Sequence, residues 1–167
     1  ANLENDLEVY LFPANTERTR SNLWKLRDHL SVKDAVGWLL AGHSHIPCLF
    51  NISSDESDYS KARPCSIHWG VPVPVNEGHY YINPGSVGQP RDGDPRASYV
   101  ILDTDTLTAT WYRIAYDMDA VTAKMYQKYT NPYRSQLLQF LRDGGTARTV
   151  QELLPFYRIE TEGLIVT

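Results

Sequence analysis

The feature that most constrains the fold is an apolar run, residues 36–41, that leads directly into the segment GHSHIP at residues 42–47. A short continuous apolar run is typical of a buried strand. In an extended backbone, residues i and i+2 point to the same face, so we expect His43 and His45 to project together from the strand end. Imidazole is the commonest side-chain metal ligand, and the pair is therefore a candidate metal site. The alternative is two surface histidines in a turn.

Other segments predict a mixture of helices and strands. Residues 17–30 carry apolar residues at helical spacing, and residues 97–103 and 108–116 form the clearest hairpin because they are rich in Val, Ile, Tyr, Trp and Thr. Two prolines limit residues 65–75 to an edge strand. The remaining expectations are a strand or loop at 46–52, a strand at 79–82, a turn at 76–78, a mobile excursion at 53–63, a packed loop at 8–13 and helices at 121–129, 133–142 and 149–154.

Composition bounds the class of protein. A length of 167 residues with 42% hydrophobic residues suits one domain or part of one and argues against disorder. A net charge of −4 offers no basic surface for nucleic acid or an anionic membrane, and no apolar run is long enough to span a bilayer. The first residues are polar and acidic, unlike a signal peptide, so we expect a cytoplasmic protein.

The cysteines, Cys48 and Cys65, are expected to be free thiols because nothing in the sequence indicates an oxidising compartment. A zinc site built from both cysteines and the histidines is the alternative, although the spacing fits no standard zinc pattern. The other histidines, His29, His68 and His79, are expected to be ordinary surface or partly buried residues.

A second candidate site lies in the segment NPGSVGQPR, residues 83–91. Asn-Pro-Gly-Ser favours a tight turn, and backbone N–H groups in such turns form anion-binding concavities. Arginine adds a bidentate contact to phosphate. We therefore take Asn83, Gly85, Ser86 and Arg91 as candidate substrate-binding residues. The alternative is a structural loop in which the arginine pairs with one of the aspartates that follow it.

The two segments occur in an order that resembles the C-terminal half of the calcineurin-like metallophosphoesterases, in their small bacterial and archaeal phosphodiesterase branch. The resemblance rests on GHSHIP and on INPGSVGQPRDGDPRASY at residues 82–99, and it covers about residues 7–103. It implies an α/β (α+β) fold, the C-terminal half of a four-layer α/β/β/α sandwich. The family motifs D-x-H, G-D, G-N-H-[DE] and a lone histidine, which precede this segment in the family, are not matched ahead of GHSHIP. We therefore expect a single partial domain, residues 1–167, with a helical C-terminal extension at 117–167.

The resemblance also implies the chemistry. Members of the family hydrolyse phosphoesters with a hydroxide held between two divalent transition metal ions, and His43 and His45 match one ligand of each ion. The sequence does not choose among Mn, Fe, Ni, Co and Zn. The implied partners are a phosphodiester or small phosphomonoester substrate and the missing N-terminal half, in the same or a separate chain. A homo-oligomer is compatible with the sequence.

Two imidazoles are too few ligands for such a centre, so we expect this chain alone to be inactive. An incomplete domain is also expected to expose an apolar strip where the missing half packs. The alternative function, from a different class, is a non-catalytic scaffold or interaction module with the same fold, since fold alone does not establish activity.

Overall fold

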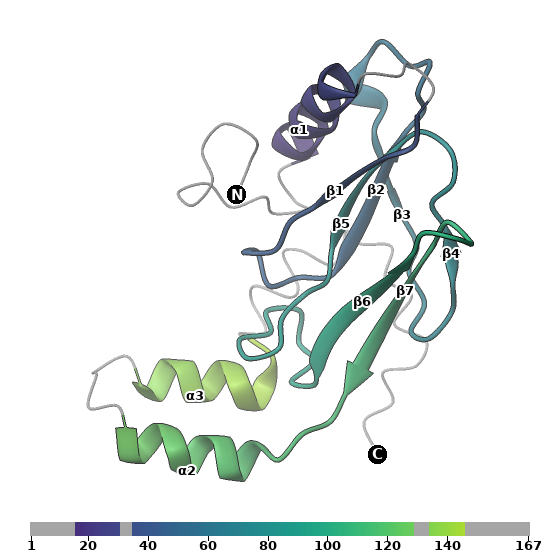
Figure 1. The fold of residues 1–167 in the computed structure, drawn as a ribbon. Coiled ribbons are helices and arrows are strands. Elements are labelled where there is room, and N and C mark those ends of the chain that lie inside the picture. Colours follow the sequence, from purple (N-terminus) through teal and green to yellow (C-terminus); the bar gives the residue numbers. More distant parts are fainter. Residues whose placement is uncertain (1–15, 31–34, 129–133, 146–167) are drawn as a thin grey trace.

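The computed structural model describes residues 16–30, 35–128 and 134–145. Within them, two β-sheets are packed together, α1 covers one of the sheets, and α2 and α3 lie beyond one end (Figure 1). The elements are α1 (Thr16–His29), β1 (Gly37–Leu40), β2 (Cys48–Ile52), the 3₁₀ turn η1 (Tyr59–Lys61), β3 (Arg63–Cys65), β4 (Val73–Pro74), β5 (His79–Asn83), β6 (Ala97–Asp103), β7 (Thr108–Ile114), α2 (Met118–Lys128) and α3 (Arg134–Asp143).

The first sheet has the strand order β1-β5-β2-β3, and the second has the order β4-β7-β6. β1 and β5 are parallel, whereas β5–β2, β2–β3, β4–β7 and β6–β7 are antiparallel. All five residues of β5 are buried because the strand has a neighbour on each side and packed side chains on each face.

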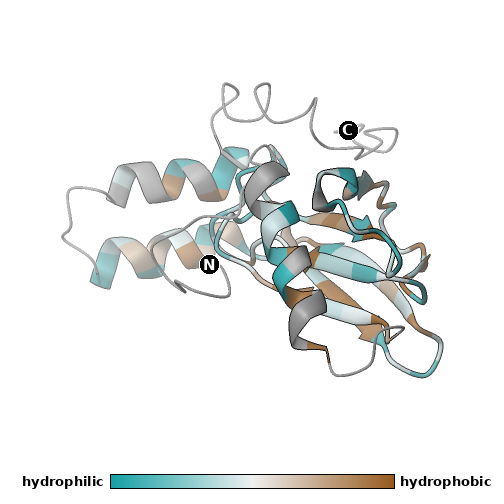
Figure 2. Ribbon diagram, turned by 90° about the horizontal axis from the view of Figure 1, so that it is seen from above, coloured by the Kyte–Doolittle hydropathy of each residue, from teal (hydrophilic) through white to brown (hydrophobic). Residues whose placement is uncertain are grey.

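The core consists of two apolar clusters, one on each face of the first sheet. Phe50 and Tyr81 face α1 and contact Leu23, whereas Leu49 and Ile82 lie between the sheets. This division follows from the strand period of two, which sends neighbouring residues to opposite faces. The hydrophobic colour in Figure 2 gathers on the strands, and α2 mixes hydrophobic and hydrophilic residues along its length.

Most of the predicted elements are confirmed. The helix expected at 17–30 is α1, the hairpin is β6–β7, and the helices expected at 121–129 and 133–142 are α2 and α3. The last two fall within the predicted extension at 117–167. The loop predicted at 8–13 and the helix predicted at 149–154 lie outside the described residues.

Two expectations were wrong. The strand at 36–41 is not buried, because it forms the edge of the described sheet and Leu40 is 56% exposed. His79 is fully buried rather than partly exposed. Residues 53–63, predicted as a mobile excursion, contain η1, and Arg20 of α1 donates a hydrogen bond to the carbonyl of Ala62 at 3.1 Å. Their mobility stays a prediction.

The second sheet has one face in the core and one that is half open. Tyr99 and Tyr112 stack on the open face with ring centroids 5.1 Å apart, and Ile101 and Ile114 are each about half exposed. None of the helices in the described ranges is long and apolar enough to cross a membrane.

Candidate functional site

The two candidate segments meet because of how β1 and β5 are paired. The strands are parallel, with Leu40 opposite Ile82, so their carboxyl ends lie at the same end of the sheet. The chain leaves β1 into residues 41–47 and leaves β5 into residues 84–96. The backbone N–H of Ala41 still donates to the carbonyl of Ile82 at 3.1 Å, which keeps the two exits side by side.

Asn83, the last residue of β5, is the polar centre of this end of the sheet. Its side chain is fully buried, and its amide nitrogen donates to the hydroxyl oxygen of Ser44 at 2.9 Å and to the carbonyl of Gly42 at 3.3 Å. Its amide oxygen accepts from the backbone N–H of Gly85 at 2.9 Å. Asn83 thus connects the histidine segment to the loop after β5 and positions both. Direct contact of Asn83 with substrate stays a prediction of the sequence.

His43 and His45 do not lie in extended backbone, so the argument that placed them on one face was wrong. Their φ angles are 70° and 62°, in the left-handed region, and the N–H of Ser44 between them bonds back to the carbonyl of Gly42 at 2.9 Å. Left-handed backbone costs an L-residue about 1–2 kcal/mol. Strain of this kind concentrates at functional sites, where the surrounding structure over-determines it.

The ring of His45 has a defined orientation. Its Nδ1 lies 2.8 Å from the carbonyl oxygen of Gln89, and a carbonyl only accepts, so this nitrogen carries the proton. The Nε2 lone pair then remains for a metal ion, which is the arrangement typical of ligating histidines. Burial lowers the pKa of His45, the Gln89 hydrogen bond opposes this, and the charges of Arg91 and His43 lower it further. A neutral imidazole is the form that binds metal.

The loop after β5 is shaped by its own side chains. Gly85 has a φ of 90°, and a Cβ there would lie 2.8 Å from the hydroxyl oxygen of Ser98, so only glycine fits. The hydroxyl of Ser86 accepts from the backbone N–H of Gln89 at 2.9 Å. The structure therefore gives Gly85 and Ser86 a role in forming the turn, while their contact with substrate stays a prediction.

Arg91 lies at the same end and is close enough to His45 for its charge to act on that ring. The aspartates that follow it have other arginine partners. Asp92 pairs with Arg113 of β7, and Asp94 receives a bidentate hydrogen bond from Arg96, with the shortest contact at 2.6 Å. The contact of Arg91 with phosphate stays a prediction.

Sequence reasoning missed Arg113. It is almost fully buried, its Nη1 donates to the carbonyl of Arg96 at 3.0 Å, and its guanidinium carbon lies 4.5 Å from the ring centre of Trp69. The available signal was its place in the predicted hairpin: Ala109, Trp111 and Arg113 alternate toward the core face. A charge at an inward-facing strand position requires a buried partner.

The ligands for a complete metal centre are not all present in the described part of the chain. No group of three or more His, Cys, Asp and Glu side chains there is placed to hold a metal ion. The zinc alternative fails, because Cys65 is paired with Leu49 in the sheet and Cys48 faces the opposite side, toward α1. Both cysteines are free thiols, as predicted.

Comparison with known proteins points to one superfamily. No family model matches the chain. The chain is 38% identical over 90 residues to an uncharacterized protein of Methanocaldococcus jannaschii, a match that covers 54% of this chain and 32% of that protein. It is 37% identical to the crystal structure of a metallophosphoesterase from Sphaerobacter thermophilus, with a TM-score of 0.54, over 64% of this chain and 42% of that one.

The likeness to the Sphaerobacter protein extends to both sequence and fold, and it supports the metallophosphoesterase superfamily at that level. The chain spans about a third of the length of the curated relative that it matches, since the match covers 32% of that protein.

Proposed function

We propose that this chain forms part of a metal-dependent phosphoester hydrolase, with His43 and His45 as ligands of a dinuclear metal centre. The observation that carries the proposal is the orientation of His45, whose Nδ1 is 2.8 Å from the carbonyl of Gln89. An imidazole fixed in this way, on which the charges of His43 and Arg91 act, is suited to holding a metal ion next to an anionic substrate. The likeness to a metallophosphoesterase supports the same chemistry.

Each residue has a distinct task in this proposal. The metal ions, when bound, supply an activated hydroxide and clamp the phosphate oxygens. His43 and His45 each offer one neutral imidazole to the ions. The Gln89 carbonyl holds the His45 ring in one tautomer, and the guanidinium of Arg91 binds a phosphate oxygen. Asn83 hydrogen-bonds to both segments and so fixes their positions relative to each other.

The remaining metal ligands come, in this proposal, from polypeptide other than the described residues, either in the same chain or in a separate one. The chain matches only 42% of the length of the similar metallophosphoesterase, which leaves room for them. The proposed substrate is a phosphodiester or a small phosphomonoester, because a two-metal clamp with one arginine suits a compact phosphoryl group.

The test is hydrolysis of a bis-aryl phosphate by the chain supplied with the upstream half of the fold. We expect activity that depends on a divalent transition metal and disappears with a chelator. His43→Ala or His45→Ala is expected to lower kcat more than about 100-fold, since even the groups that orient metal ligands are worth about 10–100-fold. Arg91→Ala is expected to raise KM and leave the metal content unchanged.

His68→Ala is the matched control, because His68 is an exposed histidine that belongs to neither of the two candidate segments. Equal rates for the wild type and for both histidine variants would overturn the proposal. That result would favour the alternative, a non-catalytic scaffold with the same fold.

A further inference from the structure

The C-terminal end of α3 rests on the loop that borders the candidate site. Gly144 and Gly145 follow α3, are buried, and have φ angles of 71° and 114°. The carbonyl of Gly144 accepts a hydrogen bond from the backbone N–H of Gly93 at 2.9 Å. A segment more than 40 residues downstream therefore contacts the loop through its backbone.

These two glycines allow an approach that a larger residue would prevent. A Cβ on Gly144 would lie 2.4 Å from the backbone nitrogen of Asp94 and 2.5 Å from the carbonyl carbon of Gly93. A Cβ on Gly145 would lie 3.1 Å from the Cα of Arg91. All these neighbours are backbone atoms, so a side chain at position 144 forces either the loop or the end of α3 to move.

The same loop is also held by β7. Arg113 pairs with Asp92, and its Nη1 donates to the carbonyl of Asp94 at 3.4 Å. The loop at 89–94 thus contacts both a buried guanidinium and the glycine pair. This loop supplies the Gln89 carbonyl that orients His45, and it carries Arg91.

We propose that Gly144 and Gly145 are positioning residues for the site: by seating α3 against the 89–94 loop, they hold the Gln89 carbonyl on His45 and fix the backbone of Arg91. This inference rests on the proposed function of the same site. The helices α2 and α3 contact each other beyond the end of the sheets (Figure 1). The inference gives this helical segment a role in the geometry of the site.

The test measures the tautomer of His45 in the full chain without metal, by ¹⁵N NMR of the imidazole nitrogens above the ordinary pKa of histidine. In the wild type we expect the proton on Nδ1, donated to Gln89. Neutral imidazole in water favours the proton on Nε2. Gly144→Ala is therefore expected to shift the population from Nδ1–H toward Nε2–H, because the displaced loop withdraws its carbonyl.

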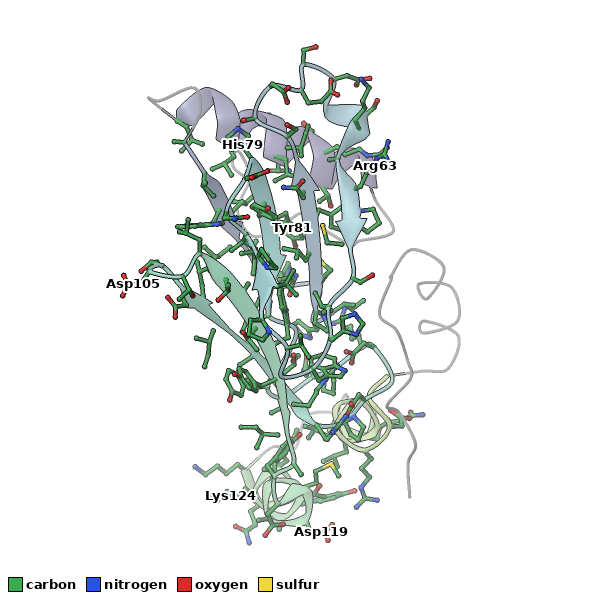
Figure 3. The ribbon with its side chains drawn as sticks, turned by 90° about the vertical axis from the view of Figure 1, so that its right-hand side faces the viewer. Arg63, His79, Tyr81, Asp105, Asp119 and Lys124 are labelled. Carbon is green, nitrogen blue, oxygen red and sulfur yellow. The ribbon has the colours of Figure 1, made fainter. Side chains whose placement is uncertain are left out.

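Gly78→Ala is the matched control. Gly78 has a φ of 83°, and a Cβ there would lie 2.3 Å from the carbonyl oxygen of Ile52, so the backbone clash is similar in kind. Gly78 precedes His79, which Figure 3 shows at the opposite end of the molecule from Asp119 and Lys124 of α2. We expect Gly78→Ala to destabilise the fold while leaving the His45 tautomer unchanged in the folded protein.

Gly145→Ala provides a milder variant if Gly144→Ala does not fold, since its closest contact is 3.1 Å rather than 2.4 Å. An unchanged Nδ1–H tautomer in whichever glycine variant folds would overturn the positioning role and leave the proposed function in place. A wild-type His45 protonated on Nε2 would instead contradict the site geometry on which both proposals rest. An equal shift in Gly78→Ala would mean that general destabilisation is the cause, which also overturns the positioning role.

Discussion

The two ends of the first sheet are built in different ways. At the His79 end, backbone packs on backbone: the N–H of Gly37 donates to the carbonyl of Gly78 at 3.1 Å, and a Cβ on Gly78 would lie 2.3 Å from the carbonyl of Ile52. At the Asn83 end, the strands separate, and polar side chains connect the exits. Asn83, Ser44 and the carbonyl of Gly42 form that connection.

The difference shows why the candidate site lies where it does. At the His79 end, backbone hydrogen bonding between the neighbouring segments continues beyond the paired strands. At the other end, the backbone has left the sheet, and it adopts left-handed conformations at His43 and His45. The charge of His43 acts on the ring of His45, so the two side chains belong to the same end of the sheet. Binding residues are typically held in this way, on loops positioned by a rigid sheet.

The largest effect is expected from the buried charge at the Asn83 end. Arg113→Met leaves Asp92 buried without its cation, and breaking a buried ion pair in this way costs about 3–5 kcal/mol. Lys61→Ala is the control, because the Lys61 and Glu56 side chains of its ion pair are 57% and 21% exposed and a surface pair contributes little to stability. Urea unfolding of both variants measures the difference. Equal losses would mean that the charges at this end are not buried as described.

A smaller effect is expected from the polar centre. Asn83→Ala leaves buried partners such as the Ser44 hydroxyl unsatisfied, at a cost of about 1–3 kcal/mol each. Asn51→Ala at the His79 end is the matched control, since its amide donates to the carbonyl of Glu77 at 3.1 Å in an exposed position. We expect the control to lose at most about 1 kcal/mol of its free energy of unfolding. If the control loses as much free energy of unfolding as Asn83→Ala, the two ends of the sheet are not held in different ways.

The backbone strain at the site predicts a gain in stability. His43→Gly relieves a left-handed residue and is expected to raise the free energy of unfolding by up to about 1 kcal/mol while weakening metal binding. Leu107, in the β6–β7 turn with a φ of 53°, offers the comparison. Leu107→Gly relieves the same kind of strain without touching the site, so metal binding should not change. Thermal unfolding without metal measures the gain in stability, and the further shift of the midpoint on adding metal measures metal binding.

The smallest effect concerns the thiols. Burial raises the pKa of the Cys48 thiol well above its usual range, and it also raises the pKa of Cys65, which is only partly buried. The thiolate is the reactive form, so both should alkylate slowly in the folded protein, with Cys65 ahead of Cys48. Mass spectrometry after timed iodoacetamide treatment gives the order. Faster modification of Cys48 would show that the α1 face of the sheet opens readily.

Local sequence patterns predicted the elements whose structure depends on local propensity. The β6–β7 hairpin follows from its β-branched and aromatic residues, and α3 ends where Gly144 prevents continuation. The resemblance to a family supported GHSHIP and the loop after β5 as candidate segments, and the parallel pairing of β1 with β5 explains why the two segments meet.

The rest depends on contacts between distant residues, which no local pattern encodes. The left-handed backbone at His43 and His45 contradicts their expected extended conformation, and it is held by Asn83 from another strand. The contact of Gly144 with the 89–94 loop joins residues about 50 positions apart. Arg113 was predicted as part of a strand, but its partners lie in that same loop.

We propose that His43 and His45 each supply one ligand to a dinuclear metal centre at the Asn83 end of the sheet. Co²⁺ titration followed by NMR tests this assignment most directly, because paramagnetic broadening reports the position of the ions without requiring turnover. We expect the broadening to centre on His43, His45 and the 89–94 loop, to be weakened in His45→Ala and to be unchanged in His68→Ala. Broadening centred elsewhere, or unchanged in His45→Ala, would contradict the assignment.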